Sequence, residues 1–359
     1  MHSVLLGVVK QFLSLWMNSG GKCSIKNKVN DIDAILLNIR PPQFFNRMPR
    51  TITEYARYKA SEFYNFLLFY SVPVLIDILP KVYFQHWLLL VISIFNLLKQ
   101  PITIFPDLSI TEILLKLFVR DIGTLYTDEA YSYNVHQLLH LVLCVMRWGP
   151  LDASSAFCFE NYNNFLANCV HGTKQLGIEM VNNLRLAQAV QNLKKQCELS
   201  NDSLNTAGNN KFLNEIKSDD PIIAGEKLFL MSKGLHVENL TIFQRSEINN
   251  EIYTSLIYKD VKTNSFAVEI QTNYGVYYGN IKYYLKNGND LTLVLALFTV
   301  LHNKMFIHEE TNTVVSHILP VQEENRDILI KLTEINFICH LIKVRNFVCK
   351  RPYLLKKIN

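Results

Sequence analysis

The sequence lacks the features that mark secreted, disulfide-bonded or strongly basic proteins. Its seven cysteines show no C-x-x-C pair and no regular spacing, which argues against a disulfide framework and for a reducing compartment. The start does not read as a signal peptide, because Lys10 interrupts a short apolar segment and no small-residue cleavage site follows. The net charge over 359 residues is only +5. We therefore expect a nuclear or cytoplasmic protein that is not secreted.

Apolar runs long enough to cross a bilayer are also scarce. Residues 63–79 and 83–98 form the two nearest candidates, and Pro73 and Asp77 interrupt the first of them. The second spans about 16 residues, whereas a bilayer needs about 20. We interpret both segments as buried core helices and expect no membrane partner. A membrane protein built on residues 63–98 is the least favoured alternative.

The first half of the chain has the periodicity of amphipathic and buried helices. Helix-start signals support this pattern, among them Ser109 with Glu112 three residues later, which forms a capping box, and Asn134 at the start of another segment. The predicted helices cover residues 1–16, 53–71, 73–79, 83–99, 109–125, 134–146, 160–168 and 176–196.

The composition changes after about residue 200. An Asn-, Ser- and Gly-rich stretch at 200–211 is typical of a linker, and alternating β-branched and aromatic residues follow it. We predict an α+β protein: a helical region at 1–199, a linker at 200–221 and a small antiparallel β domain, sandwich or barrel, at 222–359. The predicted strands cover residues 252–258, 265–271, 276–284, 291–299, 314–320, 335–344 and 347–350.

The last 20 residues carry a local excess of positive charge. They contain six lysines or arginines and no acidic residue. Such a segment can contact nucleic acid phosphates or remain solvated. DNA is therefore a possible partner, and the candidate contact residues are Lys343, Arg345, Lys350, Arg351, Lys356 and Lys357.

Two histidines and one glutamate stand out in the helical region. His136 and His140 are four residues apart and so share one helix face. Glu160 lies in the apolar F-C-F-E-N-Y-N segment, where a buried carboxylate is costly unless it is paired or binds a metal. Zinc needs about four ligands and no cysteine pair is available. Hydrogen-bonded core histidines and a glutamate at a helix N-terminus are therefore the alternative interpretations.

Six segments of the chain occur in an order that points to a known family: H-S-V-L-L-G-V-V-K, R-M-P-R, Y-K-A-S-E-F-Y-N-F-L-L-F-Y, N-V-H-Q-L-L-H-L, G-P-L-D-A-S-S-A-F-C-F-E and V-H-G-T-K. They resemble the C-terminal part of CACTA (En/Spm)-like DDE-type DNA transposases, over roughly residues 1–180. The resemblance implies the helical C-terminal portion of an RNase H-like core. In that core two aspartates and one glutamate hold two Mg²⁺ ions for DNA strand cleavage and transfer.

The resemblance also assigns individual residues. Glu160 matches the third carboxylate, and His136 and His140 match a histidine pair upstream of it. His2 resembles the end of a D-x-x-H motif whose aspartate would lie two residues before Met1. One carboxylate of three cannot hold two metal ions. The resemblance therefore implies no cofactor in this chain, Mg²⁺ in the complete ancestral enzyme, and zinc as a possibility at the histidine pair.

Three functional hypotheses follow. The first is a transposon-derived protein, an incomplete transposase remnant that lacks two of three catalytic carboxylates and keeps DNA or protein binding, including self-association. The second is the C-terminal part of a longer, active DNA transposase. The third is the membrane protein described above.

Overall fold

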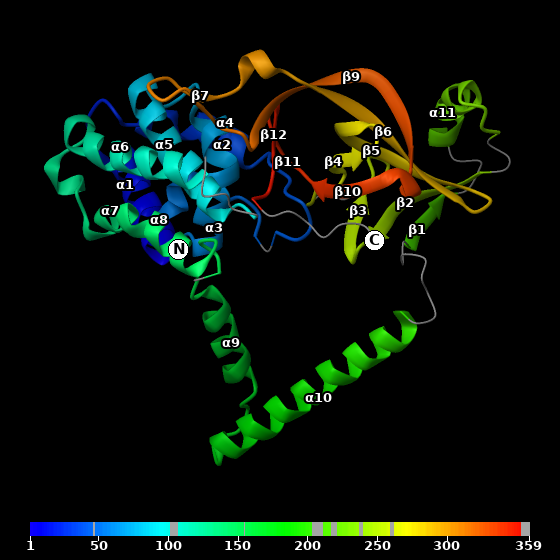
Figure 1. Cartoon of the computed structure of the whole chain (residues 1–359), viewed down its shortest axis with the longest axis horizontal. Coiled ribbons are helices and arrows are strands. Elements are labelled where there is room, and N and C mark those ends of the chain that lie inside the picture. The colour runs from blue at the N-terminus through cyan, green and yellow to red at the C-terminus, as the bar shows by residue number, and fades with distance from the viewer. Residues whose placement is uncertain are drawn as a thin grey trace.

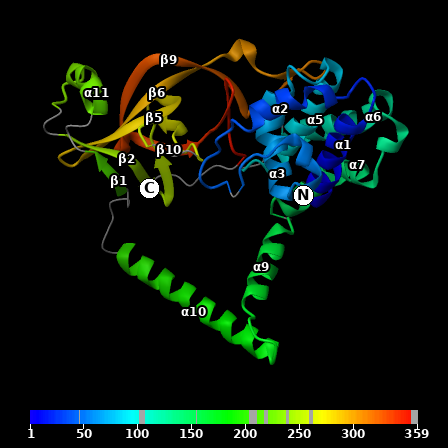
Figure 2. The ribbon, with the colours of Figure 1, turned by 180° about the vertical axis from the view of Figure 1, so that it is seen from behind.

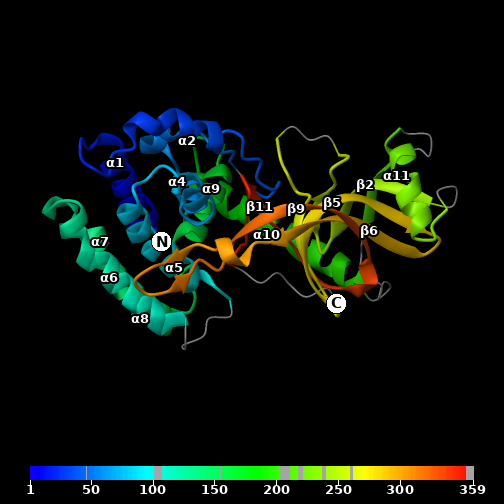
Figure 3. The same cartoon turned by 90° about the horizontal axis from the view of Figure 1, so that it is seen from above.

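The computed structural model describes residues 1–45, 47–100, 107–153, 155–202, 211–216, 221–236, 240–258 and 262–352. It combines a helical body with a curved antiparallel sheet, so the predicted mixed α and β class is confirmed. The body and the sheet occupy opposite ends of the long axis, with β9 (Ile318–Lys331) and β11 (Ile342–Val344) between them (Figures 1 and 3). The RNase H-like assignment of the helical half stays a prediction.

The helical body is built from helices close to those that the sequence predicts. The predicted helix 109–125 coincides with α6, whereas the predicted helix 53–71 is interrupted. A 3-10 segment at Ile52–Arg57 comes first, and α3 begins only at Ala60 because the Glu62 carboxylate accepts the Lys59 N–H and caps the new helix. The helices of the body are α1 (Lys10–Asn18, preceded by a π-helical segment at Ser3–Val9), α2 (Val29–Leu36), α3 (Ala60–Asn65), α4 (Ser71–Leu75), α5 (Lys81–Leu98), α6 (Ser109–Leu125), α7 (Tyr133–Gln137) and α8 (Leu141–Trp148).

Helix α5 is the central helix of the body. It is long and apolar enough to cross a membrane by length and composition, and 83% of that window is buried inside the molecule. Two of its polar side chains have buried partners: Trp87 Nε1 donates to Ser71 Oγ at 2.9 Å, and His86 Nε2 lies 2.8 Å from the Phe118 carbonyl oxygen. Helix α5 therefore occupies the core position predicted for residues 83–98.

Within the described residues the sheet has ten strands, all antiparallel, in the main order β1-β2-β5-β6-β9-β12-β11. Strands β5 and β6 approach so closely that a Cβ at Gly279 would lie 2.2 Å from the Ala296 carbonyl oxygen, which requires glycine there. The strands are β1 (Lys211–Ile216), β2 (Leu240–Ile248), β3 (Glu251–Thr254), β4 (Ala267–Thr272), β5 (Gly275–Asn287), β6 (Asp290–Val300), β9 (Ile318–Lys331), β10 (Ile335–His340), β11 (Ile342–Val344) and β12 (Phe347–Cys349). Strands β7 (Ile307–His308) and β8 (Thr313–Val314) form a separate pair.

The boundary between the two halves differs from the prediction. Helix α9 (Phe157–Asn168) and helix α10 (Leu176–Asp202) leave the helical body and lead the chain back toward β1 (Figures 1 and 2). Helix α10 extends past residue 199, β1 begins at Lys211 and pairs with β2, and α11 (Pro221–Ser232) follows. The predicted linker 200–221 therefore contains a sheet strand and a helix start, and the β region begins before residue 222.

Part of the C-terminal region also packs into the hydrophobic core of the helical body, whereas most of the sheet packs around buried clusters of its own. Side chains of the C-terminal part, including Ile318, Ile342 and Val344, belong to the same buried cluster as the helical body. Pro73 in α4 has no N–H to offer the carbonyl of Phe69, four residues earlier, and Cys349 Sγ donates to that oxygen instead at 3.3 Å. The end of the chain therefore returns to the helical body, and the division into separate domains stays a prediction.

Candidate nucleic-acid interface

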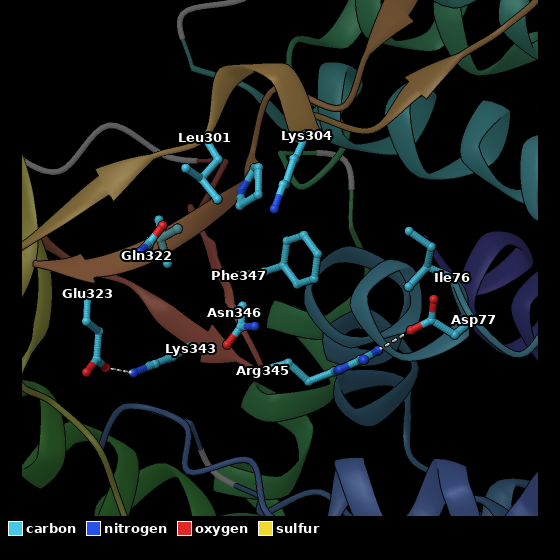
Figure 4. A pocket seen from close by; sticks show the side chains of 12 residues that line it. Ile76, Asp77, Leu301, Lys304, Gln322, Glu323, Lys343, Arg345, Asn346 and Phe347 are labelled. Atoms are coloured by element: carbon cyan, nitrogen blue, oxygen red, sulfur yellow. Dashed lines mark hydrogen bonds and ion pairs between the residues drawn. The ribbon is translucent and has the colours of Figure 1, made fainter.

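A cleft of about 600 Å³ lies where β9, β11 and β12 meet the helical body. Its lining includes the apolar residues Ile76, Leu301 and Phe347, and Lys304 and Arg345 are among its cations. In Figure 4 the Lys304 side chain points toward the Phe347 ring and the Arg345 side chain extends toward the α4 end of the cleft. The third cation, Lys343, lies on β11. Apolar, basic and acidic side chains thus line the cleft together.

The β11–β12 hairpin positions Arg345. Val344 pairs with Phe347, so the hairpin turn consists of Arg345 and Asn346 alone. Arg345 has φ of 54°, a left-handed conformation that non-glycine residues adopt uncommonly and that often marks functional positions. Its Nη1 donates to Asp77 Oδ2 at 2.9 Å and to the Pro73 carbonyl oxygen at 3.2 Å. These contacts hold the guanidinium at the edge of the cleft.

The carboxylate partners of the cleft cations are solvent-exposed and can be replaced by another anion. Lys343 Nζ pairs with Glu323 and also lies 5.3 Å from the centre of the Phe298 ring. The acidic partners Asp77 and Glu323 each have 65% of the side chain exposed. Ion pairs in such solvent-exposed settings contribute about 0–1 kcal/mol. A phosphate with its fixed negative charge can therefore compete for these cations.

Lys350 and Arg351, also predicted as nucleic-acid contacts, are built into the fold. Lys350 Nζ lies 3.0 Å from the buried Glu269 carboxylate and donates to Tyr278 at 2.7 Å. Burial opposes the charged form of Lys350, but the Glu269 carboxylate and the Tyr278 hydroxyl outweigh it and raise its pKa. Arg351 Nη2 lies 3.3 Å from Glu251. Both cations have internal partners and belong to the structure of the β region.

The remaining two predicted contacts, Lys356 and Lys357, lie outside the described residues. Lys343 and Arg345 therefore line the same cleft. Lys350 and Arg351 instead form ion pairs within the β region. Sequence reasoning missed Lys304, which lies in a 3-10 turn at His302–Lys304 between β6 and β7. A lone lysine in a turn carries no signal of its own. Lys304 lines the cleft only because the fold brings its turn near residues of β11, which lie far away in the sequence.

The predicted histidine pair is brought together. His136 in α7 and His140 in the following 3-10 turn have their Nε2 atoms 3.2 Å apart, and both side chains are exposed. They are therefore hydrogen-bonded to each other at the surface and are not core histidines. Among the described residues, no group of three or more His, Cys, Asp or Glu side chains is placed to hold a metal ion.

Glu160 lies in α9, within the predicted helix region. Helix α9 begins at Phe157, which puts Glu160 in its first turn, as the helix N-terminal interpretation requires. The side chain of Glu160 is outside the described part of the structure.

Comparison of the chain with protein-family models, with curated proteins and with solved structures finds no match.

Proposed function

We propose that this chain is a transposase-derived DNA-binding protein that binds DNA without cutting it. The observation that carries the proposal is the clustering of Lys304, Lys343 and Arg345 at one cleft between the helical body and the sheet. Phosphate contacts by lysine and arginine supply most of sequence-independent DNA affinity. The resemblance of residues 1–180 to CACTA-like transposases supports DNA as the polyanion and a nuclear location.

The absence of cleavage follows from the same resemblance. It assigns one catalytic carboxylate to these 359 residues, Glu160, and a two-metal site needs the charge of all three. If the chain is the C-terminal part of a longer transposase, two upstream aspartates would complete the site. In both cases the proposed cleft would contact the DNA backbone.

A binding experiment with duplex DNA tests the proposal. We expect the double variant Lys304→Gln/Arg345→Gln to lose about tenfold in affinity per cation. The slope of log K against log salt should fall by about 1.8, because each phosphate contact contributes about 0.9. The measurement is fluorescence anisotropy of a labelled duplex across a salt series.

The matched control is Lys26→Gln/Arg326→Gln, which removes the same charge from exposed positions that do not line the cleft. It should leave the affinity close to wild type. Equal losses in the two double variants would show that binding follows total charge and would reject the cleft. Thermal unfolding of both variants checks that the protein is folded.

A further inference from the structure

A second cavity, of about 240 Å³, lies under the loop that joins α2 to α3. The loop extends from the helical body toward the sheet (Figure 1). It is fixed there by hydrogen bonds from Gln43 N to Ser265 Oγ at 2.9 Å and from Asn264 N to the Pro41 carbonyl oxygen at 3.1 Å. The P-P-Q-F-F-N-R loop thus presents its aromatic side chains from an anchored backbone.

The walls of the cavity are aromatic. Phe44 and Phe45 come from the loop, and Tyr64 and Phe69 come from the helical segment at 60–75. Ring centres are 5.9 Å apart for Phe45 and Phe69 and 6.0 Å apart for Tyr64 and Phe69. Phe44 is 41% exposed, which leaves part of its ring accessible to a planar ligand.

The charge of the lining is positive. Arg47 and Arg351 line the cavity and no carboxylate does, whereas the two larger cavities both include acidic side chains. Arg47 is exposed and has no ion pair within the described residues. The Arg351 guanidinium lies 4.3 Å from the centre of the Phe44 ring. The lining therefore favours a ligand that is both aromatic and anionic.

One donor of this lining is also unsatisfied. Arg351 Nε is buried and has no hydrogen-bond acceptor among the described residues. A buried donor without an acceptor is energetically unfavourable. The Nη2 atom of Arg351 is paired with the Glu251 carboxylate.

The size of the cavity limits the ligand. Sites for drug-sized molecules have volumes of roughly 300–1,000 Å³, so 240 Å³ suits a single planar ring system. Proteins that bind single strands combine aromatic platforms with arginine and lysine contacts to phosphate. An unpaired nucleotide supplies both parts, a ring to stack and a phosphate to pair with arginine.

We propose that this cavity takes one unpaired nucleotide of single-stranded DNA, with the base stacked on Phe44 and the phosphate held by Arg47. The proposal rests on the DNA-binding function proposed above and adds a preference for unpaired bases. Arg351 would support the Phe44 ring from within the fold.

The test compares oligo-dT with a duplex of the same length by fluorescence anisotropy. Phe44→Leu keeps apolar bulk and removes the aromatic face, so it should weaken oligo-dT binding by about 5- to 150-fold and leave duplex binding unchanged. Phe44→Trp should retain binding. Arg47→Gln should lower the salt slope for the single strand by about 0.7.

The controls are Tyr274→Leu, which alters an aromatic side chain that is 78% exposed in the β4–β5 turn, and Arg326→Gln. Both positions lie outside the cavity lining and should leave oligo-dT affinity unchanged. An oligonucleotide with abasic sites should bind the wild-type protein as weakly as oligo-dT binds Phe44→Leu.

Two failures are distinguishable. If duplex DNA binds but folded Phe44→Leu binds oligo-dT like wild type, the cavity assignment is overturned. If neither DNA form binds, the proposed function itself fails. Free thymidine monophosphate that binds as tightly as oligo-dT, with the same sensitivity to Phe44→Leu, would overturn the assignment to a strand.

Discussion

His317 Nε2 lies 3.0 Å from the carbonyl oxygen of Leu68, a contact between residues 249 positions apart. The His317 ring also stacks on Phe95 of α5, with ring centres 3.8 Å apart. Both interactions are buried. They join the start of β9 to the middle of the helical body and make the C-terminal strands part of its core.

The buried histidines predict a specific acid sensitivity. Burial lowers the pKa of His317 to about 3, and Lys99 adds to this effect while the Leu68 carbonyl opposes it. An unfolded histidine has a pKa near 6.5. Between about pH 6.5 and 3 the unfolded chain therefore binds more protons, and the free energy of unfolding falls as the pH falls.

Between about pH 3 and 6.5, we expect His317→Gln to reduce the slope of the free energy of unfolding against pH by about 1.4 kcal/mol per pH unit, because one titrating group is removed. Urea denaturation at a series of pH values measures it. The exposed His302 supplies the control variant, His302→Gln. If the free energy of unfolding depends on pH equally in the wild type and in His317→Gln, then His317 is not buried in its neutral form.

The shared core predicts that the two halves stay together when the chain is cut. A protease site inserted at 203–210 should yield fragments that co-elute in size-exclusion chromatography, because Ile318, Ile342 and Val344 pack in the helical core. Arg345→Ala should weaken this association only slightly, since its pair with Asp77 is exposed. Separate elution of a folded C-terminal fragment would support the two-domain division.

The sequence predicted the local elements better than their assembly. Helix α6 has the bounds that the apolar period predicts, although Leu108 and not Ser109 is its N-cap and no side chain caps it. Strand β2 was missed because polar residues such as Gln244 and Arg245 mask its alternation, and pairing with β1, β3 and β5 stabilises it. The cleft depends on contacts between distant residues such as Arg345 and Asp77, which no local pattern encodes.

The histidine pair predicts weak metal binding. Zinc–nitrogen distances of about 2.0–2.1 Å give a tetrahedral N···N edge of roughly 3.3 Å, close to the 3.2 Å between His136 and His140. Without further ligands among the described residues, bound zinc should stay below one equivalent. Elemental analysis after mild chelation should find almost none, and His140→Ala should abolish the remainder. A full equivalent that survives chelation would contradict this.

The carboxylate assignment predicts that the chain alone does not cut DNA. Supercoiled plasmid incubated with the protein and Mg²⁺ or Mn²⁺ should stay intact, because Glu160 supplies one of three required metal ligands in the family that the chain resembles. Glu160→Ala should leave DNA affinity unchanged. Nicking that depends on the metal and disappears in Glu160→Ala would show that the missing carboxylates come from elsewhere.

Site-specific crosslinking tests most directly whether the cleft binds DNA. A photoreactive side chain would replace Gln322, which lines the cleft, or Tyr274, which lies outside it. We predict that irradiation in the presence of duplex DNA crosslinks the protein through position 322 and not through position 274. Equal crosslinking at the two positions, or crosslinking at position 274 alone, would contradict the assignment of the cleft as the DNA-binding surface.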